Sequence, residues 1–212
     1  MSVIIYKRGS KSPMVGQIQA ALHLIQDNYY GQLTEEAVRM FQMKNGLKPD
    51  GIVGPATLAK LIPQRFKKSK RAIREIIIHC TATPEGKDYT VEQIRADHKK
   101  QGWSDIGYHY VIYRDGSIHE GRDVDLIGAH CVGHNAYSIG VCYVGGVENK
   151  PGVPYSKLKA KDTRTELQKN SMLSLLMDLR KLYPSAIIVG HHDYEPKKDC
   201  PSFDAKKVFS RI

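Results

Sequence analysis

The chain has 212 residues, of which 41% are apolar and 25% are charged. This length allows one domain of ordinary size together with a small one. No segment approaches the roughly 18 consecutive apolar residues that a membrane-spanning helix needs, which excludes a protein built on such helices. Four cysteines are too few and too widely spaced for a disulfide framework.

The N-terminal residues Met1–Arg8 place their basic residues after a very short apolar run. This is the wrong order and length for a secretory signal peptide. We therefore expect a protein that is made in the cytoplasm and leaves it, if at all, by a route without a cleaved signal.

Basic charge is concentrated in one short segment. Residues 64–75 contain six basic residues and one acidic residue, which supply half of the formal net charge of +10. We interpret residues 64–74 as a solvated linker rather than a nucleic-acid site, because the segment lacks a series of aromatic residues on which bases could stack. Such a segment would also be attracted to an anionic polymer of the cell envelope.

Three short helices are predicted before this linker, in residues 1–63. Ser12 and Pro13 are an N-cap and a first helical residue. Thr34 is the predicted cap of a second helix that turns Val38 and Phe41 inward, and Gly54-Pro55-Ala56-Thr57 starts a third. The second and third helices begin with a similar Gly-x-x-Thr step, which hints at an internal repeat.

Residues 75–212 predict an α/β domain with a mixed sheet and helices on its faces. The elements, in chain order, are a strand over 75–80, a helix opened by the capping box Thr90-Val91-Glu92-Gln93, a hairpin over 108–120 with Asp115-Gly116 at its turn, a strand over 138–144, a surface loop over 147–162, a long helix from Thr165 with Leu167 and Met172 among its inward residues, a strand over 187–190, and a closing helix over 203–211.

Two of these strands each deliver a histidine to their carboxyl ends, where open α/β sheets usually carry their sites. His79 ends the first strand, His191 follows the strand over 187–190, and Cys200 lies in the polar loop after it. If the two strands are neighbours, the three side chains can converge. Two imidazoles and a thiolate, with a fourth position left to water, form a catalytic zinc site, whereas a structural zinc site usually has four protein ligands.

The remaining cysteines and histidines have other interpretations. Cys80 and Cys142 stand within apolar runs and are interpreted as small buried hydrophobic residues. His192 follows His191 directly, and adjacent residues of a strand point to opposite faces. Only one of these two histidines should therefore reach a metal ion.

A resemblance to known families adds to this interpretation. The string Asp50-Gly51-Ile52-Val53-Gly54-Pro55-Ala56-Thr57, with Phe41-Gln42 and Asn45-Gly46-Leu47 before it, resembles the three-helix peptidoglycan-binding domain over residues 6–63. The match departs from the family around residues 25–30, where the family often has a glycine turn. The resemblance implies that residues 1–63 hold the chain on the cell wall; the alternative is a structural cap on the second domain.

The second domain is similar to the type-2 N-acetylmuramoyl-L-alanine amidases, which include the short phage amidase lysozymes and the peptidoglycan-recognition proteins. The matching motifs cover nearly all of residues 75–206 and include Ile78-His79-Cys80-Thr81-Ala82-Thr83, Gly107-Tyr108-His109-Tyr110, Gly128-Ala129-His130, Ser138-Ile139-Gly140-Val141-Cys142, Gly190-His191-His192 and Lys198-Asp199-Cys200-Pro201-Ser202-Phe203-Asp204.

This resemblance implies roles for individual residues. His79, His191 and Cys200 match the zinc ligands of the family, Tyr108 and Lys198 match its catalytic tyrosine and lysine, and His130 matches a histidine that lines the substrate groove. The loop between His191 and Cys200 is one residue longer than in the short phage enzymes. Alignment on the cysteine favours Lys198, whereas alignment on the histidine pair favours Lys197.

The implied activity is hydrolysis of the amide between N-acetylmuramic acid and the L-alanine of the stem peptide, by water that a zinc ion activates. We expect a monomer that acts on peptidoglycan, either as a phage lysin or as a bacterial enzyme exported by a specialised machine. The alternatives are a module that recognises peptidoglycan without cutting it, an amidase that also regulates a protein partner, and a nucleic-acid binder that uses the basic linker.

Overall fold

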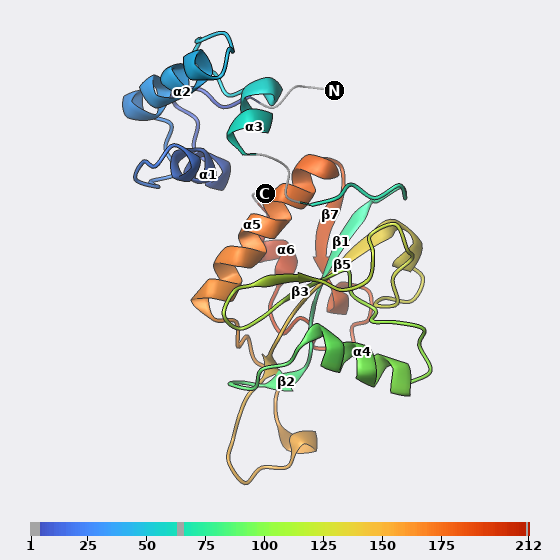
Figure 1. Cartoon of the computed structure of the whole chain (residues 1–212). Helices are drawn as coiled ribbons and strands as arrows, with labels where there is room; N and C mark the ends of the chain where they lie inside the picture. The colour runs from blue at the N-terminus through green and yellow to red at the C-terminus, as the bar shows by residue number, and fades with distance from the viewer. Residues whose placement is uncertain (1–4, 63–65, 211) are drawn as a thin grey trace. The chain divides into compact units, whose positions relative to one another are not determined.

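The computed structural model describes residues 5–62, 66–210 and 212 of the chain (Figure 1). The chain folds into two compact units, whose boundary in the sequence falls between Phe66 and Lys67. The predicted domain boundary after residue 63 lies outside the described residues. None of the helices in the described ranges is both long and apolar enough to span a bilayer.

The described part of the N-terminal unit contains three helices, as predicted. They are α1 (Pro13–Ala21), α2 (Gln32–Lys44) and α3 (Pro55–Leu61). The Ser12 side chain caps α1 by accepting a hydrogen bond from the backbone N–H of Val15. The core of the unit contains Val15, Ile18, Tyr30, Val38 and Val53, all of which are fully or almost fully buried.

Two buried glutamines reveal the internal repeat in this unit. Gln19 and Gln42 each donate from Nε2 to an aspartate eight residues later, to a backbone carbonyl ten residues later and to a threonine fifteen residues later. Each Oε1 also accepts a backbone N–H of the following turn. The predicted Gly-x-x-Thr repeat therefore corresponds to two equivalent polar clusters, which fix the turns before α2 and α3.

These clusters explain where the prediction of α2 was wrong. The helix begins at Gln32 with Gly31 as its N-cap, not with Thr34. Thr34 is buried in the first turn of the helix, where its hydroxyl accepts the amide of Gln19. On the next turns Gln42 is buried, whereas Phe41 remains half-buried.

The C-terminal unit is built on a five-stranded sheet in the order β4-β3-β5-β1-β7. Strand β1 is parallel to both of its neighbours, β5 and β7, and β3 is parallel to β5. Only the hairpin of β3 and β4 is antiparallel in this sheet. The strands are β1 (Glu75–Cys80), β3 (Tyr110–Ile112), β4 (Ile118–Glu120), β5 (Ser138–Tyr143) and β7 (Ile187–Gly190), and a second small sheet pairs β2 (Thr83–Pro84) with β6 (Gly146–Val147).

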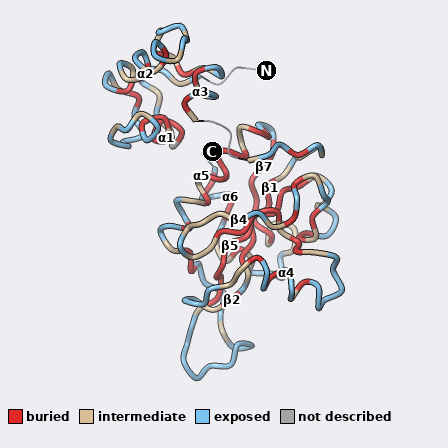
Figure 2. The backbone as a smooth tube through the Cα atoms, in the orientation of Figure 1, coloured by how far each residue is buried: buried red, intermediate tan, exposed pale blue. Residues whose placement is uncertain are grey.

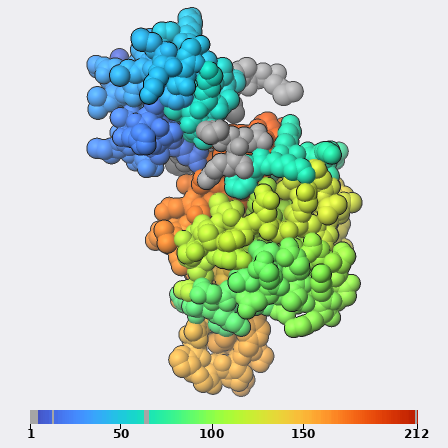
Figure 3. Space-filling view, viewed as in Figure 1, coloured from blue at the N-terminus to red at the C-terminus, as the bar shows by residue number. Residues whose placement is uncertain are grey.

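The predicted mixed sheet with helices is confirmed. Its helices are α4 (Val91–Lys100), α5 (Glu166–Leu182) and α6 (Ala205–Val208), with short 3-10 helices η1 (Asn135–Tyr137), η2 (Tyr155–Lys157) and η3 (His191–Asp193). Buried residues gather along the strands, whereas the loop between β6 and α5 is exposed (Figure 2). This loop projects from its unit (Figure 3).

The prediction for α5 was wrong at one position. Leu167 is 58% exposed, whereas its neighbour Gln168 is fully buried. The Gln168 amide donates to the backbone carbonyls of Ile112 and Val144, which lie at the ends of β3 and β5. A polar side chain therefore occupies the inward position, because it donates to backbone carbonyls to which an aliphatic residue could not donate.

Candidate metal centre

The sheet brings the predicted ligands together at its carboxyl edge. Ile78 of β1 pairs with Gly190 of β7, so that His79 and His191 follow next to each other. The chain then turns through η3 and returns at Cys200, whose carbonyl accepts a hydrogen bond from His192. The Cys200 thiol in turn accepts the backbone N–H of Cys80. The expected neighbourhood of the two strands is confirmed.

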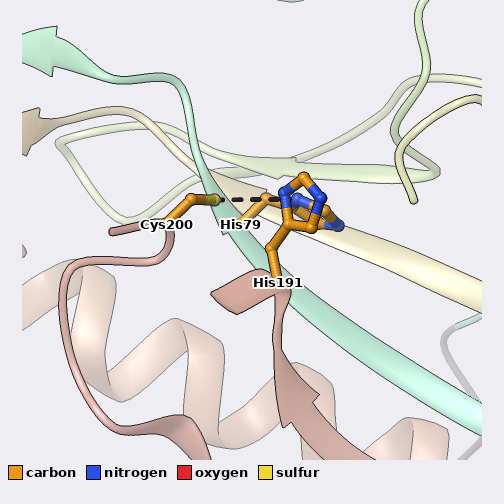
Figure 4. Close-up of side chains that lie close together, drawn as sticks. All are labelled: His79, His191 and Cys200. Carbon is orange, nitrogen blue, oxygen red and sulfur yellow. Dashed lines mark hydrogen bonds between the residues drawn. The ribbon is translucent and has the colours of Figure 1, made fainter. Parts of the chain in front are cut away.

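His79, His191 and Cys200 form a compact set of donors (Figure 4). One donor atom from each lies within 4.8 Å of the other two. Cys200 Sγ is 3.7 Å from His79 Nδ1. Ligand atoms of a tetrahedral zinc ion with N and S donors stand roughly 3.6 Å apart, so that this spacing fits such an ion. Three protein donors leave a fourth position open, which is typical of catalytic rather than structural sites.

The surroundings favour the protonation states that a metal needs from the histidines. Burial, followed by the nearby His130 and His191, lowers the pKa of His79 well below its ordinary value. Burial also lowers the pKa of His191. The hydrogen bond with Cys80 and burial raise the pKa of the Cys200 thiol. Both imidazoles are thus neutral at pH 7, and the thiol requires a nearby cation to ionise.

The second nitrogen of His79 faces His130. His79 Nε2 lies 3.1 Å from His130 Nδ1, and His130 Nε2 lies 3.3 Å from the hydroxyl of Ser138. That hydroxyl donates to the carbonyl of His134. Only 6% of His130 is exposed, because its ring fills the space that the missing Cβ of Gly140 leaves. His130 therefore orients His79, and its contact with substrate stays a prediction.

Glu195 is a site residue that sequence reasoning missed. Its Oε1 lies 2.9 Å from His191 Nε2, and its Oε2 lies 2.9 Å from the ammonium nitrogen of Lys198. The sequence does show a carboxylate four residues after the predicted ligand His191. It does not show the path of the loop, and so does not predict that the two side chains meet. The ion pair also places Lys198, rather than Lys197, beside the metal ligands, and the charge of Lys198 lowers the pKa of both histidines.

Tyr108 lies beside His79. The centroids of the two rings are 5.1 Å apart. Burial raises the pKa of Tyr108 well above its ordinary value, and the Cys142 thiol, next to His79 in the sheet, adds to the effect. The phenol therefore stays protonated at neutral pH and can donate a hydrogen bond at the edge of the metal centre.

Comparisons with known proteins agree with this fold. The N-acetylmuramoyl-L-alanine amidase family matches residues 69–203, and a family described as a peptidoglycan binding domain matches residues 12–61. The endolysin of Klebsiella phage KP32 is 44% identical over 137 residues, which are 65% of this chain and 85% of that protein. The endolysin of Escherichia phage T7 is 42% identical over 144 residues, which are 68% of this chain and 90% of that protein.

Solved structures show the same architecture. The endolysin amidase LysCS from Clostridium intestinale matches with a TM-score of 0.53 and 26% identity, over 67% of this chain and 86% of that one. A mostly parallel sheet with two histidines and a cysteine at its carboxyl edge defines the class of the protein. The chain belongs to the N-acetylmuramoyl-L-alanine amidase family, and its activity is the hydrolysis of peptidoglycan.

Proposed function

We propose that this protein is a zinc-dependent amidase that cleaves the bond between N-acetylmuramic acid and the L-alanine of the stem peptide, as a lysin of the phage type. The convergence of His79, His191 and Cys200 on one point carries this proposal. The likeness to phage endolysins supports the biological role. We further propose that the protein is a monomer, made in the cytoplasm, that acts on the wall after its release.

The three donors would hold the metal ion. A zinc ion bound there supplies Lewis acidity, which polarises a substrate carbonyl and lowers the pKa of a water molecule towards about 7. The protein orients the ligands from outside: His130 holds the second nitrogen of His79, and Glu195 holds that of His191. Such outer contacts fix the direction of each imidazole.

Tyr108 and Lys198 flank the ligands and would act on the substrate. As the carbonyl carbon becomes tetrahedral, negative charge develops on its oxygen. The neutral phenol of Tyr108 can donate a hydrogen bond to this oxygen or orient the attacking water. The ammonium of Lys198 supplies positive charge next to the same position. Because this side chain is half exposed, it has room to move towards the substrate.

The N-terminal unit would act as a wall anchor. Its match to a peptidoglycan binding domain supports this role. Binding of one unit to an insoluble polymer raises the effective concentration of the other at the same surface. The described basic residues Lys68 and Lys70, after the boundary, would add attraction to anionic wall polymers, whereas Lys67 is paired with Asp123 and Asp125.

Metal analysis tests the proposal directly. The purified full-length protein is expected to contain one zinc ion per chain, to lose lytic activity on peptidoglycan when a chelator removes the ion, and to regain it with one equivalent of zinc. Full activity of the metal-free protein would contradict the proposal. Wall binding without any cleavage in the zinc-loaded state would favour a recognition module instead.

A further inference from the structure

Glu195 stands between a proposed metal ligand and a proposed catalytic lysine. One carboxylate oxygen contacts His191 Nε2 and the other contacts the Lys198 ammonium, both at 2.9 Å. The Glu195 side chain is 35% exposed, whereas the His191 side chain is only 8% exposed. The carboxylate thus bridges from the solvent-accessible loop to the buried ligand.

We propose that Glu195 is a positioning residue that couples the metal ligand His191 to Lys198 through its two oxygens. The inference rests on the proposed zinc site. A carboxylate accepts hydrogen bonds only, so the proton of the neutral His191 ring is held on Nε2. The other nitrogen, Nδ1, is thereby left unprotonated and available to a metal ion.

The same carboxylate balances charge at the centre. A zinc ion with two neutral imidazoles and one thiolate carries a net charge of about +1. The Lys198 ammonium adds a second positive charge at short range, which weakens the binding of a cation. The negative charge of Glu195 compensates for the positive charge of Lys198, and the ion pair between them orients the Lys198 side chain. Lys198 can thus stay close to the substrate position without expelling the metal.

A second arrangement of these residues provides the competing hypothesis. Donor atoms of Cys131, His191 and Glu195 also lie within 4.8 Å of one another. A metal ion there would have to displace the proton that joins His191 to Glu195. It would also have to ionise Cys131, whose pKa burial raises to about 11. The hydrogen bond between His191 and Glu195 is therefore favoured over a second metal site.

Zinc affinity measured on the full-length protein tests the proposal. Competition with a chromophoric chelator gives the zinc dissociation constant of the wild type, Glu195→Ala and Glu195→Gln. Loss of an outer partner typically costs 10–100-fold in metal affinity, and we expect this range for Glu195→Ala. Glu195→Gln keeps an acceptor for His191 but loses the charge, so its loss should be smaller. Glu166→Ala is the matched control, since Glu166 forms an exposed ion pair with Lys169 on α5, and its affinity should not change.

A nuclear magnetic resonance measurement locates the proton. Long-range proton–nitrogen spectra of the zinc-loaded protein should show His191 protonated on Nε2, with a slowly exchanging proton that is lost in Glu195→Ala. If Glu195→Ala fails to fold, the zinc affinity of the isosteric Glu195→Gln carries the test, because this variant removes the charge but should keep the His191 proton signal.

Three outcomes are separable. Unchanged zinc affinity and an unchanged His191 proton signal in both variants would overturn the positioning role. Two zinc ions per wild-type chain, falling to one in Glu195→Ala, would overturn it by making Glu195 a ligand with Cys131. A wild-type protein that binds no zinc would refute the proposed function, on which this inference rests.

Discussion

Sγ of Cys200 lies 3.7 Å from Nδ1 of His79, although 121 positions separate these two residues in the chain. The loop after η3 brings the thiol back to the end of β1. Because Ser is a poor zinc ligand compared with a thiolate, Cys200→Ser is expected to weaken zinc binding more than about 100-fold, beyond the loss for an outer partner. Metal content after gel filtration measures the effect, and Cys131→Ala, outside the donor set, should keep its zinc.

The two adjacent lysines are expected to behave differently. Lys198 pairs with Glu195 beside the ligands. Its replacement by Ala should lower kcat on the order of a hundredfold or more, because it removes a charge that stabilises the developing oxyanion. Lys197→Ala is the matched control and should retain nearly all activity. Near-normal turnover in Lys198→Ala, or a large loss in Lys197→Ala, would contradict the assignment.

Tyr108→Phe removes one hydroxyl and leaves the ring against His79. We expect kcat to fall by roughly a hundredfold, since a hydrogen-bond donor at the reacting carbonyl is lost. Zinc affinity should stay at the wild-type value, because Tyr108 is not among the three donors. A parallel loss of zinc would show instead that the tyrosine supports the metal site.

The buried glutamine of α2 should control the stability of the N-terminal unit. Gln42→Ala leaves the buried backbone N–H of Gly51 without its acceptor, which costs about 1–3 kcal/mol. Hydrogen exchange of the α2 and α3 amides measures this loss. Gln32→Ala, on the exposed start of the same helix, should have almost no effect. Equal exchange rates of the α2 and α3 amides in the two variants would show that the hydrogen bonds of Gln42 do not stabilise this unit.

Acid should destabilise the C-terminal unit through His109. Its Nδ1 accepts the backbone N–H of Gly140, while burial and then the Arg71 guanidinium lower the pKa of the ring to about 4. In the unfolded chain a histidine is protonated below about pH 6.5, whereas the folded His109 ring is protonated only below about pH 4. The contribution to stability is therefore complete above pH 6.5 and is lost between pH 6.5 and 4.

This loss amounts to about 3 kcal/mol for the one group. Urea unfolding of the wild type and of His109→Gln at pH 7.5, 5.5 and 4 measures it. The glutamine can accept from Gly140 and donate to Leu126 without titrating, so its stability should depend less on pH. If the free energy of unfolding depends on pH in the same way in the wild type and in His109→Gln, groups other than His109 cause the acid sensitivity.

Sequence reasoning predicted the sheet well, because apolar runs bounded by glycine report burial directly. It identified the runs that form β1 and β7, and the Asp-Gly turn of the hairpin between β3 and β4. It was wrong at Thr34, whose hydroxyl accepts the Gln19 amide instead of capping α2. It was also wrong at Leu167, because helical periodicity does not show that the neighbouring Gln168 donates to buried backbone carbonyls. Contacts of this kind depend on elements that meet only in three dimensions.

The approach of the three donors was also predictable, since His79 lies near the end of β1 and His191 directly follows β7. The contact of Glu195 with His191 could not be predicted, because it depends on the path of a loop. The contact of His130 with His79 could not be predicted either, because it depends on the space that Gly140 leaves for the His130 ring. The proposal of Lys198 rather than Lys197 likewise draws on a contact, the ion pair with Glu195, that alignment alone does not supply.

The most direct measurement is mass spectrometry of the products that the zinc-loaded protein releases from purified peptidoglycan. We predict free stem peptides with an L-alanine amino terminus and intact glycan strands, both lost on chelation and restored by zinc. Cleaved glycan strands, cuts within the peptide, or no new amino termini with zinc present would contradict the proposed amidase.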